Sequence, residues 1–139
     1  MLFRDCAGGV VFCGEKVFLL KNEKDEWVLP KGRIRDDKLS TETAIERVKI
    51  EAGIDAQILL SVGETHYEFY SNTRRVPVAN RINWYIMEAA DETFNVNKEL
   101  QYQEGGYFLI EEAIEKITYS QDKGLLSVAV RKYRQTKTA

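Results

Sequence analysis

The sequence predicts an α/β protein, an α/β/α sandwich in which a mixed β-sheet is covered by helices on both faces. Three observations lead to this fold class. β-rich segments occupy residues 7–30, one long helical pattern follows them, and two more helical patterns close the chain after a second group of strands. The length of 139 residues suits a single core. We therefore expect one domain over residues 1–139, with a polar tail at about 135–139.

The first segments predict a β-hairpin and a short third strand. The runs "AGGVVFC" (7–13) and "KVFLL" (16–20) are rich in β-branched and aromatic residues, and only "GE" separates them. "EWVLP" (26–30) is a short extended piece that ends in proline. Residues 31–39 are polar and charged, so we expect a loop there.

A helix is predicted to begin near residue 40. Ser40 or Thr41 is suited to cap it, and the acidic Glu42 suits its first turn. Gly53 is expected to end the helix in a left-handed conformation. Between these ends, apolar side chains recur at helical spacing, namely Ala44, Ile45, Val48 and Ala52.

The second half of the chain predicts three more strands and two helices. Two long strands are expected to flank a loop, and one shorter strand is expected to precede the C-terminal helices. The expected strands are 56–70, 81–89 and 105–110, the loop is 71–80, and the helices are 111–117 and 124–134. Strands interrupted by one helix and followed by two helices are the basis for a sheet covered on both sides.

Composition excludes several classes of function. The net charge of −2 is not that of a general nucleic-acid binder, which is usually strongly basic. No apolar run is long enough to cross a bilayer, and the N-terminus lacks the apolar core of a signal peptide. Cys6 and Cys13 are expected on opposite faces of one strand, unpaired and reduced, which favours the cytoplasm. One histidine and no CxxC motif argue against a zinc site.

Three quoted segments carry a resemblance to a known family. "AGGVVF", "EWVLPKG" and "KGRIRDDKLSTETAIERVKIEAGI" (31–54), with the later strands and helices, resemble the Nudix (MutT-like) hydrolases over almost the whole chain. The resemblance implies a Nudix-type α/β/α sandwich. It also implies cleavage of a pyrophosphate linkage by magnesium ions that glutamates hold on one helix. The structural positions of the family's box motif match here at Gly32, Val48, Glu51, Gly53 and Ile54.

The chemical positions of the box mostly differ from the family. Lys38 stands at the first glutamate, Glu46-Arg47 stands where the family has Arg-Glu, and Ile50 replaces another glutamate. Positions 47, 50 and 51 share one helix face, which here keeps a single carboxylate, Glu51. Arg47 is expected to repel a metal ion and to pair with Glu51 or Glu46. If desolvated, such a pair would keep Glu51 from binding metal.

Two interpretations of the altered box motif remain. In the first, the chain is still an enzyme, and Glu51 is the catalytic residue. Mg²⁺ or Mn²⁺ would then be held by Glu51, the Gly32 carbonyl and a downstream acid, Glu104 or Glu99, together with substrate phosphates.

In the second reading, side-chain cations meet the phosphate directly and no cofactor is needed. Arginine suits this role because its fork matches phosphate oxygens. The alternative is a solvated, charged surface, since nearby acids partly cancel the field. The residues assigned to ligand binding are Lys31, Gly32, Arg33, Arg35, Arg47 and Tyr70.

Three functions follow from these readings. The chain is a Nudix-fold protein that binds a nucleotide or another pyrophosphate-containing small molecule, with phosphohydrolase activity weakened or lost. Alternatively it is an active hydrolase of nucleoside or dinucleoside polyphosphates. The third reading is a non-catalytic interaction module in which Ile50 marks a partner surface. The sequence leaves a homodimer open.

Overall fold

A mixed seven-stranded sheet forms the centre of the protein in the computed structural model, which describes residues 1–138. The main strand order is β3-β2-β1-β6-β5, with β4 paired to β1 and β7 paired to β2. β1 and β6 run parallel, and the other pairs are antiparallel. The strands are β1 (Leu2–Cys13), β2 (Lys16–Lys21), β3 (Trp27–Val28), β4 (Lys31–Arg33), β5 (Ala56–Ser71), β6 (Val76–Ala89) and β7 (Glu104–Leu109).

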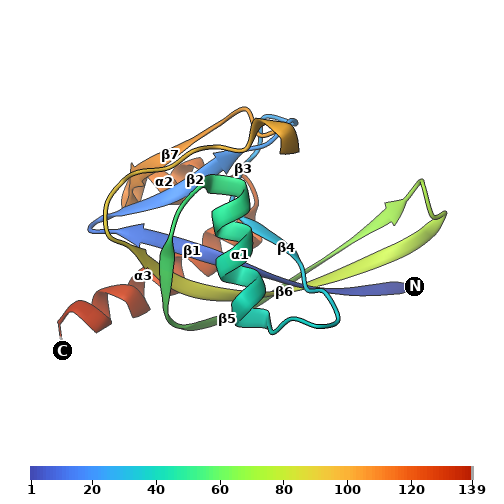
Figure 1. The fold of residues 1–139 in the computed structure, drawn as a ribbon, viewed down its shortest axis with the longest axis horizontal. Helices are drawn as coiled ribbons and strands as arrows, with labels where there is room; N and C mark the ends of the chain where they lie inside the picture. Colours follow the sequence, from blue (N-terminus) through green and yellow to red (C-terminus); the bar gives the residue numbers. More distant parts are fainter. Residues whose placement is uncertain (139) are drawn as a thin grey trace.

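Helices cover both faces of this sheet, which confirms the predicted sandwich (Figure 1). Helix α1 (Ser40–Ala52) packs on one face through Ala44 and Val48. Helices α2 (Ile110–Lys116) and α3 (Ser120–Lys137) pack on the other face. Each face therefore has its own apolar cluster, and α1 is separated from α2 and α3 by the sheet.

The N-terminal hairpin is confirmed, but the predicted loop at 31–39 is wrong in its first three residues. Phe12 lies opposite Val17 in the hairpin. Residues 31–33 form β4, which pairs with β1. This pairing needs a close approach, because a Cβ on Gly8 would lie 2.5 Å from the carbonyl oxygen of Pro30. The charged composition of the segment hid its backbone pairing.

Helix α1 begins where the sequence predicts but is capped differently. Leu39 is the N-cap residue, and its N–H donates to the Glu42 carboxylate at 3.0 Å. The predicted Ser40 cap is wrong, because the Ser40 hydroxyl accepts a hydrogen bond from Tyr85 at 2.9 Å instead. The Gly53 cap is confirmed, with φ 65° and its N–H bonded to the Lys49 carbonyl at 2.9 Å.

Strands β5 and β6 are longer than predicted. Only residues 72–75 separate them, so the predicted loop at 71–80 is wrong over most of its length. Residues 76–80 all pair with β5, and residues 78–80 also pair with β1 on the other side of β6. Figure 1 shows this hairpin projecting beyond the helices beside the N-terminal end of β1.

The C-terminal helix is also longer than predicted. It starts at Ser120 and runs to Lys137, so residues 135–137 of the expected tail are helical. Ala139, the last residue of that tail, lies outside the described residues. Cys6 and Cys13 are unpaired, as predicted. No helix within residues 1–138 is long and apolar enough to span a membrane.

Candidate functional site

The candidate site starts where β4 meets α1. The side chain of Arg47 lies across Gly32, so that a Cβ on the glycine would be 2.4 Å from Nε and 2.5 Å from Cδ of the arginine. Contacts this short mean that a larger residue at position 32 would have to displace the arginine side chain. The first glycine of the box therefore makes room for an arginine stem.

A buried network surrounds the one remaining box carboxylate. Glu51 is only 3% exposed. Its Oε2 accepts from Nη2 of Arg47 at 2.6 Å and from Nε at 3.2 Å. Its Oε1 accepts from the Lys31 backbone N–H at 3.2 Å and from the Tyr102 hydroxyl at 2.8 Å. Of the two predicted partners for Arg47, the structure pairs it with Glu51, while Glu46 pairs with Lys38 at 3.6 Å.

Tyr102 reaches this network because the segment after β6 crosses the C-terminal end of α1. The Asn95 N–H donates to the Ala52 carbonyl at 2.8 Å, and the Asn97 N–H donates to the Glu51 carbonyl at 3.0 Å. Burial, and then the neighbouring Glu51 carboxylate, raise the pKa of Tyr102. Sequence reasoning missed this residue. Its only signal was an aromatic side chain in the otherwise polar run "QYQE".

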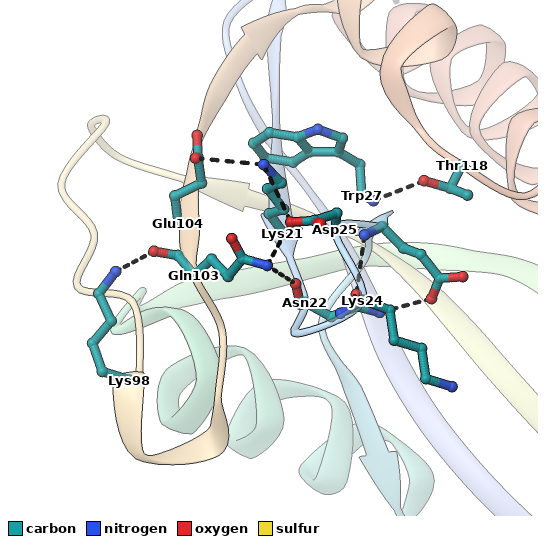
Figure 2. A network of polar contacts seen from close by, with 10 residues as sticks. Lys21, Asn22, Lys24, Asp25, Trp27, Lys98, Gln103, Glu104 and Thr118 are labelled. Carbon is teal, nitrogen blue, oxygen red and sulfur yellow. Dashed lines mark hydrogen bonds and ion pairs between the residues drawn. The ribbon is translucent and has the colours of Figure 1, made fainter.

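The acids expected from the same segment lie elsewhere. Glu104 is at the start of β7 and faces Lys21 at 4.0 Å, as Figure 2 shows. Glu99 lies within a short 3₁₀ turn (Lys98–Leu100), and its N–H donates to the Asn97 side chain at 3.0 Å. Across residues 1–138, no three His, Cys, Asp or Glu side chains come together as metal ligands would.

A divalent cation does not fit the residues around Glu51. Mg²⁺ and Mn²⁺ take oxygen ligands, and a bound ion needs free carboxylate lone pairs. Both oxygens of Glu51 already accept two hydrogen bonds each. The donor nearest to them is a guanidinium, which is always charged and repels a metal ion. Ile50, the third position on this face, adds no ligand and is 40% exposed.

The predicted anion-binding side chains divide between two faces of the sheet. Arg47 lies on the α1 side. Lys31 and Arg33 alternate with Gly32 along β4, so they point to the opposite side, where Nζ of Lys31 lies 5.7 Å from the ring centroid of Tyr67. Arg35 is exposed in the loop after β4. Tyr70 is 58% exposed, near the end of β5.

Comparisons with known proteins agree with this architecture. The chain superimposes on an Ap4A hydrolase from C. elegans with a TM-score of 0.76 and 17% identity, covering 95% of this chain and 98% of that one. The E. coli dihydroneopterin triphosphate pyrophosphohydrolase gives a TM-score of 0.72 at 13% identity, covering 91% and 95%. A MutT protein from Bacillus halodurans gives 0.63 at 19% identity, covering 89% and 80%.

These identities establish a shared fold and nothing finer. The family itself follows from the sequence, because the model of the NUDIX domain matches residues 2–127. That match includes the whole sheet, α1 and both sides of the buried network. The chain belongs to the Nudix family.

Proposed function

We propose that this protein binds a nucleotide or another pyrophosphate-containing ligand and has lost metal-dependent hydrolysis. Nudix hydrolases act on pyrophosphate-containing substrates and generally use a divalent metal such as Mg²⁺. The observation that carries the proposal is the buried contact between Arg47 and Glu51. It places a fixed cation beside the carboxylate on which a metal ion would depend.

The chemistry of a guanidinium explains why binding is retained in this proposal and hydrolysis is not. A metal ion polarises a phosphoryl oxygen and also supplies an activated water. A guanidinium supplies positive charge and N–H donors, but it has no open coordination position and activates no water. Arg47 directs Nε and one terminal nitrogen to Glu51 and remains 27% exposed. Its remaining donors are available to phosphate oxygens.

A second function is supported by a different observation. Three large apolar side chains are exposed at the N-cap and along α1, namely Leu39 at 66%, Ile45 at 41% and Ile50 at 40%, and the last two line one surface hollow. Exposed apolar groups that lie near one another are a feature of partner surfaces. This arrangement favours an interaction module whose former cleft holds no ligand.

The test measures turnover and binding on the same preparation. We expect no Mg²⁺- or Mn²⁺-dependent release of phosphate or nucleotide from ATP or Ap4A, and we expect calorimetry with EDTA to detect binding of either compound. The control is Glu51→Gln. Turnover that disappears in this variant would mean that one carboxylate suffices and that the protein is an active hydrolase. Absence of both turnover and binding would favour the interaction module.

Restoring the glutamates of the family's box motif is a second test of the same proposal. In Arg47→Glu with Ile50→Glu, three carboxylates would share the helix face, and calorimetry should detect Mn²⁺ binding that the unmodified protein lacks. The matched control is Ile45→Glu, which adds a charge to an exposed apolar position elsewhere on α1. If the double variant bound no Mn²⁺, the claim that only these side chains are missing would be wrong.

A further inference from the structure

The last strand in the order of the sheet has a free edge. Within residues 1–138, β5 pairs only with β6, so the backbone groups on its other side have no strand to bond. An edge of this kind is a template for pairing with another chain. The outer end of β5 lies in the hairpin that projects beyond the helices (Figure 1). This part of the edge is therefore accessible to a partner.

The inner part of the same edge is blocked in two ways. The register with β6 shifts twice within residues 58–63, and such bulges turn an edge strand away from a partner. Further out, the side chain of Gln121 on α3 takes the place of a neighbouring strand at His66. The His66 N–H donates to Oε1 of Gln121 at 2.7 Å, and Nε2 of Gln121 donates to the His66 carbonyl at 2.8 Å.

The contact at His66 also shows which backbone groups beyond it point outward. In an antiparallel pair, residues that bond the neighbouring strand alternate with residues that point away from it. The register is uninterrupted over residues 63–71, so the N–H and C=O groups of Glu68 and Tyr70 point away from β6 as those of His66 do. Pro77 agrees with this assignment, because it lies opposite Tyr70 and has no N–H to donate. In the part of the chain that the structure describes, no turn, loop or side-chain hydrogen bond uses these outward groups of Glu68 and Tyr70.

Two large apolar side chains are exposed beside this free edge. Tyr70 is 58% exposed and Phe3 is 76% exposed. Phe3, Ala79 and Glu68 lie opposite one another in three neighbouring strands, so they share a face, and Tyr70 shares it by alternation along β5. It is the face that carries α1, because Ala7 of β1 belongs to the apolar cluster under that helix.

The charges along the hairpin favour one direction of pairing. Glu64 and Glu68 lie on β5, whereas Arg74 and Arg75 lie in the turn at its outer end. Glu68, Arg74 and Arg75 form no ion pair with the described residues. Two copies of this edge in parallel would place acid beside acid and arginine beside arginine. Two antiparallel copies would place the arginines of each beside the glutamates of the other.

We propose that this protein forms a weak symmetric dimer in which the outer edges of two β5 strands pair antiparallel about a two-fold axis at Phe69. Glu68 of each copy exchanges backbone hydrogen bonds with Tyr70 of the other, which gives about four bonds in all. Phe69, which is 40% exposed, meets Phe69 of the second copy as an aromatic cross-strand pair. Arg74 of one copy lies level with Glu64 of the other, because both are equally far along the chain from Phe69.

This contact closes at two copies. Each copy offers the same stretch of edge, so the pairing is isologous and leaves no further outer edge for a third copy. The stretch covers only residues 67–71, which makes the interface smaller than that of a permanent dimer. We therefore expect a dissociation constant on the order of 10–100 µM. The dimer is independent of the proposed function and forms with or without a ligand.

Sedimentation velocity of the whole chain from about 5 to about 500 µM tests the dimer. The average mass should rise from the 16.0 kDa of the monomer toward twice that value. Glu68→Pro removes an N–H that the second copy needs and no bond to β6, so it should weaken association at least about tenfold. The matched control is Glu68→Gln, which keeps the N–H and removes the charge, and it should change the dissociation constant by less than about threefold.

An exchange of charges tests the direction of pairing. One variant carries Arg74→Glu with Arg75→Glu, and the other carries Glu64→Lys with Glu68→Lys. Each variant alone places like charges together across the axis and should associate more weakly than the unmodified protein. An equimolar mixture of the two should associate again, because each tip then faces the opposite charge. These side chains lie on an exposed strand and turn, so the test remains decisive if Glu68→Pro proves unfolded in urea.

Four results would overturn the inference. The dimer would be absent if the unmodified protein stayed at 16.0 kDa at the highest concentration. The contact would lie elsewhere if folded Glu68→Pro associated as tightly as the unmodified protein. It would lie at the surface hollow beside α1 if Ile45→Glu abolished association and Glu68→Pro did not. The direction would be wrong if neither charge variant weakened association. None of these results changes the binding of ATP or Ap4A, by which the proposed function is tested separately.

Discussion

Replacing Arg47 by methionine removes the guanidinium and keeps an unbranched stem across Gly32. The variant therefore changes the charge with little change in packing. Glu51, at 3% exposure, would lose two hydrogen bonds, at 2.6 and 3.2 Å, from a charged donor. A hydrogen bond to a charged group contributes about 1.5–3 kcal/mol. Because Arg47 is 27% exposed, solvent screens part of the pair, and we expect the variant to lose about 3 kcal/mol of the free energy of unfolding.

Urea unfolding followed by tryptophan fluorescence measures this change, since Trp84 is buried in the core. The midpoint should fall while the slope m stays constant, because the surface exposed on unfolding is the same. Arg35→Met is the control. Arg35 is an exposed loop arginine without an ion pair among residues 1–138, and we expect a change within about 0.5 kcal/mol.

A double-mutant cycle with Glu51→Gln isolates the pair itself. Glutamine keeps an acceptor for Tyr102 and removes the charge, so we expect the coupling between positions 47 and 51 to be about 2 kcal/mol. The reasoning would be refuted if Arg47→Met and Arg35→Met had the same stability. Glu51 would then be satisfied without its arginine, and nothing would keep it from a metal ion.

Three further changes test individual contacts by the same unfolding measurement. Tyr102→Phe should lower the free energy of unfolding by about 1.5 kcal/mol, because the buried carboxylate loses one O–H donor. Gly32→Ala should lower it by about 2 kcal/mol, because the new methyl group displaces the Arg47 stem, and a change below about 0.5 kcal/mol would contradict the close approach. Tyr119→Phe should change how the free energy of unfolding depends on pH. The Tyr119 hydroxyl is the main cause that lowers the pKa of Glu26, so its contribution is present at pH 7 and is lost as pH falls through the folded pKa. The two proteins should therefore differ in stability at pH 7, and this difference should shrink as the pH is lowered through the folded pKa of Glu26.

The sequence predicted the elements whose signals are local. The two-residue "GE" turn, the helical spacing of Ala44 and Val48 and the left-handed Gly53 each follow from residues that are close in the chain. β4 was missed because its partner is β1, about 25 residues earlier, and its own composition is that of a loop. Residues 76–80 were assigned to a loop for the same reason, since their strand conformation comes from pairing with β5, and for residues 78–80 also with β1, and not from their own sequence.

In the candidate site, too, the sequence predicted local features and missed those that depend on distant segments. The spacing of positions 47 and 51 predicted the ion pair, but not its burial, which comes from β4 on one side and the segment with Tyr102 on the other. Charge alone suggested one basic pocket around Gly32. Strand alternation splits it, because Lys31 and Arg33 point away from the side that Arg47 occupies. The alignment of Arg4 on β1, Asn80 on β6 and Tyr67 on β5 had no sequence signal, since it depends on the register of three strands.

Charge balance explains how the box could lose its acids and keep its fold. Several carboxylates on one helix face repel one another and depend on a bound cation to offset that repulsion. Here one carboxylate, Glu51, faces one guanidinium, Arg47, so the buried network is neutral without any ion. Changing Arg47 to glutamate alone would remove the cation and add an anion in the same place. A variant with restored acids would therefore depend on a bound metal ion for its stability. The present network of Arg47 and Glu51 is stable without one.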